Sequence, residues 1–226
     1  MKGMFVTGTD TGVGKTRVAT GIAQAFAARG DRVAAMKPVA SGSVHTPEGL
    51  RNDDALALLA CCNVAAQYAE INPYAFAPPI APHLAAAAAG RHIDLGVLSR
   101  AYETLALRAD VVVVEGIGGF LTPLDERDSF AVLPQCWDLD VILVVGMRLG
   151  CLNHAALTAE AIARRGLRLR GWIANAVDPH FERPADHVAA LRERLTAPCI
   201  GELPFAVEMT PAAVARALRA GLYDAP

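Results

Sequence analysis

The stretch VTGTDTGVGKTRVAT near the start of the chain has the residue types of a phosphate-binding loop that is one residue too long. Five residues separate the first glycine from Gly14, whereas the usual pattern has four before the Gly-Lys-Thr triplet. Gly12 and Gly14 allow backbone N–H groups to turn inward around an anion. Lys15 adds charge for the outer phosphates, and Thr16 offers a hydroxyl to Mg²⁺. We therefore expect a nucleotide site, with residues 9–11 lining a second pocket beside it.

Three further polar residues stand where predicted strands end. Glu115 closes a run of four valines and either holds Mg²⁺ or is a solvated carboxylate. Lys37 follows a second strand and is either a surface charge or a cation that stabilises a transferred phosphoryl group. Asn175 either reads an adenine edge with its amide or forms a turn. Because ligands of doubly wound sheets bind beyond the carboxyl ends of the strands, we expect chemistry at these positions.

Other residues near these positions leave two interpretations open. Asp53 and Asp54 begin a predicted helix. N-capping and pairing with the helix dipole explain one of them well, and one carboxylate either shares that role or joins Thr16 and Glu115 on the metal. Ser41 either solvates a loop or hydrogen-bonds to a substrate. The glycines after Glu115 either allow close approach of a ligand or make a tight turn: Gly116, Gly118 and Gly119.

The elements that must position these residues alternate along the chain. Apolar β-branched runs separated by helical patterns predict an α/β fold with a mostly parallel, doubly wound sheet covered by helices on both faces. Together with the phosphate loop, this is a fold of P-loop NTPase type. Strands are expected at residues 4–8, 32–38, 111–116, 141–146, 171–177 and 199–204. Helices are expected at residues 15–29, 53–61, 84–89, 95–109, 153–165 and 184–195, and after a Thr210 cap. Two long loops, 39–51 and 71–83, are expected to be functional or mobile.

Length, net charge and cysteine content restrict the classes of protein to which the chain can belong. The chain has 226 residues, which predicts a single domain spanning residues 1–226. A net charge of −2 gives no electrostatic case for a nucleic-acid or anionic membrane partner. The odd count of five cysteines, none in a C-x-x-C pair, predicts a reduced, cytoplasmic protein. No signal peptide and no bilayer-spanning apolar run are expected.

Taken together, several blocks of sequence resemble the dethiobiotin synthetase family. They are FVTGTDTGVGKT, KPVASGS, TPEGLRNDDALAL, VVVEGIGG, VILVVGMRLGCLNH and GWIAN, and the resemblance extends to about Pro204. It implies that ATP, CO₂ (or bicarbonate) and 7,8-diaminopelargonate give dethiobiotin, ADP and phosphate in biotin biosynthesis. One amine takes up CO₂ as a carbamate, which attacks the γ-phosphate to form a carbamic–phosphoric anhydride. The second amine then closes the ring and expels phosphate.

The resemblance also implies a role for each matching residue. Lys37 and Lys15 would be the catalytic cations, and the Mg²⁺ ligands would be Thr16, Asp54 and Glu115. The nucleotide phosphates would meet Gly12, Val13, Gly14, Lys15, Thr16, Arg17, Asp54, Glu115, Gly116, Ile117 and Gly118. Adenine would meet Asn175, Ala176, Pro204, Phe205 and Ala206. The diamine or its carbamate would meet Thr11 and Ser41. In the family's homodimer, the substrate carboxylate would meet a segment of the other subunit: Gly150, Cys151, Leu152 and Asn153.

The chain departs from the family at four positions. Well-known members have Glu at the position of Gly12, a small residue at Ile117, an acidic residue at Ala176 and a tyrosine at His187. These differences bear on base selectivity and on contacts with the substrate tail. The implied phosphate and metal residues are unchanged.

Three rival functions remain to be weighed. Partition and positioning ATPases share the fold class, but Asp10 stands where their K-G-G-x-G-K-T pattern has a signature lysine that reaches across a dimer. An acid there argues against a switch ATPase. An amidating synthase of the corrin pathway needs a glutaminase domain, for which 226 residues leave no room. The third rival is a nucleotide-binding module without catalysis.

Overall fold

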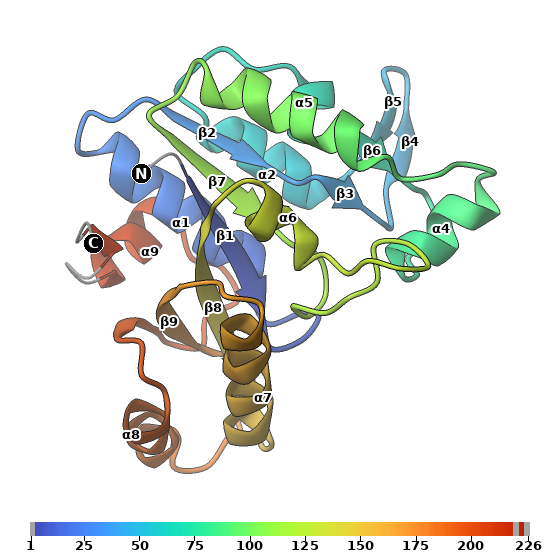
Figure 1. Ribbon diagram of the computed structural model, residues 1–226. Coiled ribbons are helices and arrows are strands. Elements are labelled where there is room, and N and C mark those ends of the chain that lie inside the picture. Colours follow the sequence, from blue (N-terminus) through green and yellow to red (C-terminus); the bar gives the residue numbers. More distant parts are fainter. Residues whose placement is uncertain (1–2, 219–221, 224–226) are drawn as a thin grey trace.

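The computed structural model describes residues 3–218 and 222–223. Its main sheet has six strands, all parallel to their neighbours, in the order β10-β9-β8-β1-β7-β2 (Figure 1). Each strand overlaps a predicted one, which confirms the parallel sheet. Their bounds are β1 (Gly3–Gly8), β2 (Val33–Met36), β7 (Val111–Glu115), β8 (Asp140–Met147), β9 (Leu169–Ala176) and β10 (Cys199–Leu203).

The predicted helices are also present, with small shifts at their ends. Gly30, at φ +93°, lies in the left-handed region just beyond the first helix, as its predicted role as a helix stop requires. The hydroxyl of Thr210 accepts a hydrogen bond from the Ala213 amide at 3.2 Å and caps the last helix, as expected. The bounds are α1 (Lys15–Ala27), α2 (Asp53–Cys61), α4 (Pro82–Ala88), α5 (Leu95–Ala106), α7 (Cys151–Arg164), α8 (Pro184–Arg194) and α9 (Pro211–Ala217).

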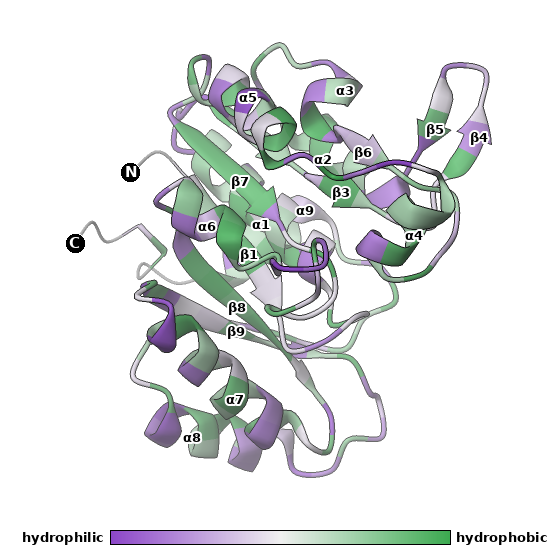
Figure 2. Ribbon diagram, turned by 45° about the vertical axis from the view of Figure 1, so that its right-hand side comes forward, coloured by the Kyte–Doolittle hydropathy of each residue, from purple (hydrophilic) through white to green (hydrophobic). Residues whose placement is uncertain are grey.

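The central strands are apolar because both faces of the sheet are covered. Every residue of β1 and β7 is buried, and Figure 2 shows β7 and β8 mostly in hydrophobic colours. Helices α1 and α9 lie on one face, whereas α7 and the short α6 (Val132–Cys136) lie on the other (Figures 1 and 2). This arrangement confirms the doubly wound fold. Within the described ranges, no helix is both long enough and apolar enough to cross a bilayer.

The expectation that residues 39–51 and 71–83 are long loops was wrong in part, because each contains short secondary structure. The first forms β3 (Val39–Ala40) and a hairpin of β4 (Val44–Thr46) and β5 (Gly49–Arg51). The second holds the end of α3 (Tyr68–Ile71), the strand β6 (Tyr74–Ala75) and the start of α4. Strands β3 and β6 pair with each other in parallel. Strands of two residues show no periodicity, so their pairing was not visible in the sequence.

Candidate functional site

The predicted phosphate loop lies between β1 and α1, at the carboxyl edge of the sheet. Gly12 and Gly14 have φ of +74° and +89°, a conformation that L side chains rarely adopt. Gly14 is also a point of close approach, because a Cβ there would lie 2.2 Å from Nδ2 of Asn175. The ammonium group of Lys15 donates a hydrogen bond to the carbonyl oxygen of Asp10 at 2.9 Å. The loop is thus wrapped around the Lys15 side chain at the start of α1.

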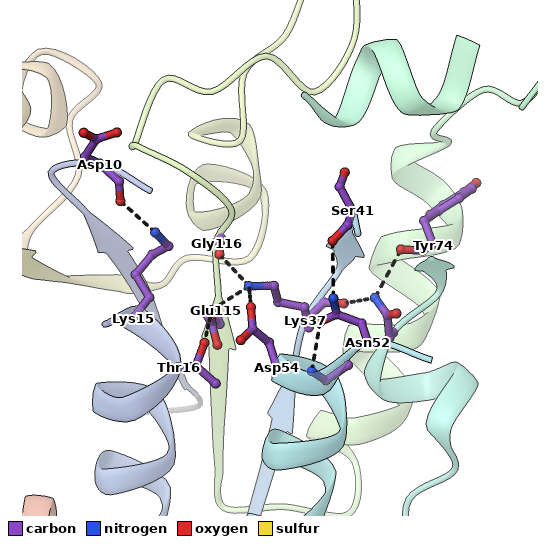
Figure 3. Close-up of polar contacts among 12 residues, drawn as sticks. Asp10, Lys15, Thr16, Lys37, Ser41, Asn52, Asp54, Tyr74, Glu115 and Gly116 are labelled. Carbon is purple, nitrogen blue, oxygen red and sulfur yellow. Dashed lines mark hydrogen bonds and ion pairs between the residues drawn. The ribbon is translucent and has the colours of Figure 1, made fainter. Parts of the chain in front are cut away.

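A charged cluster is built on Lys37, which follows β2 (Figure 3). Its ammonium group donates hydrogen bonds to Glu115 Oε1 at 2.5 Å, to Asp54 Oδ2 at 3.0 Å and to the Gly116 carbonyl at 3.3 Å. The hydroxyl of Thr16 donates to the same Glu115 oxygen at 2.9 Å. Residues from the starts of α1 and α2 and from the ends of β2 and β7 therefore meet at one point.

Burial decides two of the open interpretations. The Lys37 and Glu115 side chains are 4% and 1% exposed, so neither is the solvated surface charge that was the alternative. Burial by itself lowers the pKa of Lys37, but the carboxylates of Glu115 and Asp54 outweigh it and raise that pKa. Burial raises the pKa of Glu115 despite the opposing effect of Lys37. For Asp54, burial is outweighed by Lys37, and its pKa falls below the ordinary value.

Lys15 lies in a less favourable electrostatic environment than Lys37. Burial, followed by repulsion from Lys37, lowers the pKa of Lys15 to about 8. The carboxylates of Glu115, Asp54 and Asp10 act in the opposite direction but do not cancel these effects. Because the charged form of Lys15 is disfavoured in this environment, an approaching anion stabilises that form.

The start of α2 corrects one expectation. Its cap is Asn52, whose side-chain oxygen accepts a hydrogen bond from the Ala55 amide at 3.3 Å, so neither Asp53 nor Asp54 caps the helix. Asn52 also donates from Nδ2 to the Ser41 carbonyl at 3.3 Å (Figure 3). The Ser41 hydroxyl oxygen is buried and has no hydrogen-bond partner among the described residues. That hydroxyl is thus available to a substrate, one of the two roles considered for it.

These residues line a cavity of about 740 Å³. Most of the predicted phosphate, metal and diamine residues share it. Its lining consists of Asp10, Thr11, Gly12, Gly14, Lys15, Thr16, Lys37, Ser41, Asn52, Asp54, Pro79, Ile80, Ala81, Pro82, Glu115, Ile117, Gly118, Gly119 and Thr122. The sequence predicts only a functional or mobile role for the proline-rich loop. The prediction missed Thr122, which carries no local signal, and Asn52, whose residue type and place before a helix start are a capping signal.

The oxygen donors of the cavity fit a small, hard cation. Glu115 Oε2 is buried and has no hydrogen-bond partner in the described part of the chain. The Thr16 hydroxyl contacts the other oxygen of the same carboxylate, and Asp54 is 45% exposed beside them. A buried carboxylate oxygen left without a partner is costly unless something else satisfies it. Mg²⁺ favours one or two carboxylates together with phosphate oxygens, which this set allows.

The predicted adenine residues lie outside this cavity, at the carboxyl ends of β9 and β10. Asn175 is buried within β9, so the turn-forming alternative was wrong. Its Nδ2 donates to the Val13 carbonyl at 2.8 Å, and its Oδ1 is buried with no partner in the described residues. Strand β10 pairs Leu203 with Asn175, which brings residues 204–206 to the same edge. Ala176, the last residue of β9, lies beside them.

Arg17 contacts this second region rather than the cavity. Its guanidinium donates to the Ala206 carbonyl at 2.7 Å and to the Val207 carbonyl at 3.4 Å. Val13, also expected at the phosphates, is buried; its side chain lies against Gly8 and Gly146. Gly116 belongs to the charged cluster through its carbonyl oxygen.

The segment expected to reach a partner subunit does not line the cavity of its own chain. Gly150, at φ +94°, precedes α7, which begins at Cys151 rather than at the predicted Asn153. Just before it, Arg148 forms an ion pair with Asp10 of the phosphate loop. His187 packs against the Phe181 ring, with ring centroids 4.5 Å apart, and is also outside the cavity lining.

Comparison with known proteins adds close relatives. A family model described as an AAA domain matches residues 2–213. The chain is 53% identical to the ATP-dependent dethiobiotin synthetase BioD of Pseudomonas aeruginosa (strain UCBPP-PA14) over 216 residues, which are 95% of each protein. It is 50% identical to the protein of the same name from Xanthomonas oryzae pv. oryzae (strain PXO99A) over 215 residues, 95% of this chain and 96% of the relative.

Solved structures with a similar fold are more distant in sequence. The MinC:MinD cell division protein complex of Aquifex aeolicus matches with a TM-score of 0.58 and 17% identity, over 96% of this chain and 86% of that one. A ParA family ATPase from Chlorobium tepidum TLS matches with a TM-score of 0.55 and 13% identity, over 96% and 91% of the two chains. At such low identity these likenesses concern the fold alone, and they confirm the P-loop NTPase type.

Proposed function

Since the chain belongs to the dethiobiotin synthetase family, we propose that it converts ATP, CO₂ and 7,8-diaminopelargonate into dethiobiotin, ADP and phosphate in biotin biosynthesis. The observation that carries this proposal is the shared cavity. Five residues suited to phosphoryl transfer line it, although they come from four segments of the chain: Lys15, Thr16, Lys37, Asp54 and Glu115.

The phosphate loop supplies the binding of the triphosphate. Backbone N–H groups of residues 12–16 and the start of α1 favour an anion, and Lys15 lines the same cavity. An approaching phosphate compensates the cost of charging Lys15. In our proposal the triphosphate therefore lies along the wall made by Gly12, Gly14 and Lys15.

The metal site belongs to the proposal as well. Thr16, Asp54 and Glu115 would hold Mg²⁺, which supplies charge neutralisation at the phosphate oxygens when bound. The unpartnered Glu115 Oε2 supports this assignment. Lys37 would keep two of the three ligand side chains oriented, because its ammonium group contacts both carboxylates.

The diamine would react in three successive steps, and both cations would act at the second. One amine adds to CO₂ and loses a proton, giving a carbamate that Thr11 and Ser41 hold by hydrogen bonds. A carbamate oxygen then attacks the γ-phosphorus while the bond to ADP breaks. Lys37 and Lys15 stabilise the negative charge on the transferred group. Finally, the second amine attacks the carbamoyl carbon, releasing phosphate and a proton as the ring closes.

Adenine would lie at the second region, against Asn175, Ala176 and residues 204–206. The buried, unpartnered Oδ1 of Asn175 supports this placement, because an amide there can serve an adenine amino group. The departure at Ala176 would tune which base is accepted, whereas Ile117 lines the phosphate cavity.

A homodimer would complete the substrate site. Residues 150–153 do not line their own cavity, and Leu149 beside them is 86% exposed. In our proposal this segment binds the carboxylate of the substrate held by the other subunit, with His187 nearby. We also propose that residues 1–226 form one synthetase domain and that the protein is cytoplasmic, with neither nucleic acid nor membrane as partner.

The central experiment measures phosphate release by purified protein with ATP, Mg²⁺ and bicarbonate. We expect release only after 7,8-diaminopelargonate is added, with a product of the mass of dethiobiotin. Release without the diamine, or release stimulated by DNA, would favour the switch ATPase instead.

A mixing experiment tests the dimer. Lys37→Ala removes the proposed catalytic cation of one subunit, and Asn153→Arg blocks the segment offered to the other. Random mixing of the two inactive proteins should restore about a quarter of wild-type activity, because half the dimers are mixed and each contains one intact site. A monomer by sedimentation, or no recovery on mixing, would contradict the proposal.

A further inference from the structure

We propose that Arg17 is a positioning residue that holds the adenine-side wall of the nucleotide site and does not contact the phosphates. This inference deepens the proposed function and rests on it, because that function places adenine beside residues 204–206. It assigns to Arg17 a different role from the phosphate contact that the family resemblance implied.

The direction of the Arg17 side chain is the first argument. Arg17 is the third residue of α1 and directly follows Thr16, which lines the phosphate cavity. Arg17 itself does not line that cavity. Its guanidinium instead donates to the Ala206 carbonyl at 2.7 Å and the Val207 carbonyl at 3.4 Å. Both hydrogen bonds leave the same guanidinium nitrogen, Nη2, so one NH₂ group joins two neighbouring carbonyl oxygens of the segment.

The segment that Arg17 holds is the second argument. Residues 204–209, between β10 and α9, have no regular structure. Val207 is 87% exposed and Phe205 is 47% exposed, so apolar packing restrains these side chains little. Among the described residues, no side chain other than Arg17 hydrogen-bonds to the backbone of this segment. Arg17 therefore supplies the side-chain hydrogen bonds that tie this segment to α1, while Met209 at its end packs against the core.

The binding free energies of the base and of the phosphates should therefore depend on different residues. Without Arg17 the segment samples more conformations, and adenine must order it on binding, which weakens the affinity for the base. The phosphate loop and the Lys37 cluster do not depend on this contact. Loss of Arg17 should therefore weaken binding of ATP but not of a ligand that has phosphates and no base.

Calorimetry with two ligands tests this division. The protein is titrated with ATP and, separately, with inorganic tripolyphosphate, at the same free Mg²⁺ concentration. For Arg17→Gln we expect the Kd for ATP to rise about 5- to 20-fold and that for tripolyphosphate to stay within about twofold. Equal weakening of both ligands would mean that Arg17 acts on the phosphates, and unchanged ATP binding would mean that the tie is irrelevant. Either result overturns the proposal.

Two further variants separate positioning from a general loss of structure or charge. Arg17→Lys keeps the charge with one donor group and should bind ATP with intermediate affinity. Arg164→Gln removes a matched arginine from the exposed ion pair with Glu160 on α7 and should bind both ligands as wild type does. In steady-state assays Arg17→Gln should raise KM for ATP while kcat at saturation stays within about twofold.

Hydrogen exchange gives a measurement that needs no ligand. Amides of residues 205–209 should exchange faster in Arg17→Gln than in wild type, whereas those of β1 should not change. If the protein makes no dethiobiotin, the proposed function is wrong. The binding and exchange measurements do not depend on turnover, so they would still test the role of Arg17.

Discussion

The phosphate end and the adenine end of the proposed nucleotide site are held by different kinds of contact. At the phosphate end, the side chains of Lys37 and Glu115 are almost fully buried and joined by an ion pair. At the adenine end, an exposed segment is tied to α1 through carbonyl oxygens of Ala206 and Val207. Buried charges have few alternative arrangements, since an unpaired one is costly, whereas an exposed segment has many. Substitutions at the phosphate end should thus mainly lower kcat, and substitutions at the adenine end should mainly weaken the affinity for ATP.

The largest effect is expected from Lys37→Ala. Loss of the cation that faces the transferred group should lower kcat by about 100-fold or more. It also leaves the buried Glu115 carboxylate unpaired, which should cost on the order of 3–5 kcal/mol of stability. Activity is measured by phosphate release and stability by thermal melting.

The matched control for Lys37→Ala removes a cation from an exposed ion pair. Arg108 pairs with Glu70 and is 42% exposed, so Arg108→Ala should keep kcat within about twofold. A folded Lys37→Ala protein with near-normal turnover would remove Lys37 from the chemistry and erase the contrast between the two ends.

A smaller effect is expected from Thr16→Val, which keeps the shape of the side chain but removes the hydroxyl beside Glu115. The Mg²⁺ concentration needed for half-maximal phosphate release should rise about tenfold. Thr20→Val is the control, because the Thr20 hydroxyl bonds to the Thr16 carbonyl at 2.9 Å and lines no part of the cavity. If both variants require the same amount of Mg²⁺ as wild type, Thr16 is not a ligand.

At the adenine end, Asn175→Ala should weaken ATP binding about fivefold, the loss of one neutral hydrogen bond. It also removes the contact with the Val13 carbonyl, so a modest fall in melting temperature should accompany it. Titration calorimetry measures the affinity. A kcat at saturating ATP that fell as steeply as for Lys37→Ala would contradict the division between the two ends.

The smallest effect is a change in protonation. The pKa of Lys15 is about 8 in the free protein, and a bound phosphate should raise it. Binding therefore takes up a fraction of a proton between about pH 8 and pH 10, and affinity falls as pH rises through that window. Calorimetry of ATP binding at pH 8.5 with EDTA, in buffers of different ionisation enthalpy, measures the uptake. Lys15→Arg, which stays charged throughout, should abolish it; equal uptake in the two proteins would assign the proton to another group.

The sequence by itself determined the features that depend on neighbouring residues. The phosphate loop was predictable because Gly12, Gly14, Lys15 and Thr16 act within one turn between a strand and a helix. The parallel sheet followed from apolar runs such as the four valines before Glu115, and the Thr210 cap from a residue type that prefers such ends.

Only the tertiary structure decided the features that depend on distant residues. Lys37 looked like a surface charge as readily as a catalytic one until Glu115, 78 positions away, was seen to bury it. The direction of Arg17 was set by carbonyl groups 189 and 190 positions away, and the pairing of β3 with β6 joined two segments expected to be loops. Local propensity extends over a few residues, whereas burial and charge pairing depend on where the whole chain places each group.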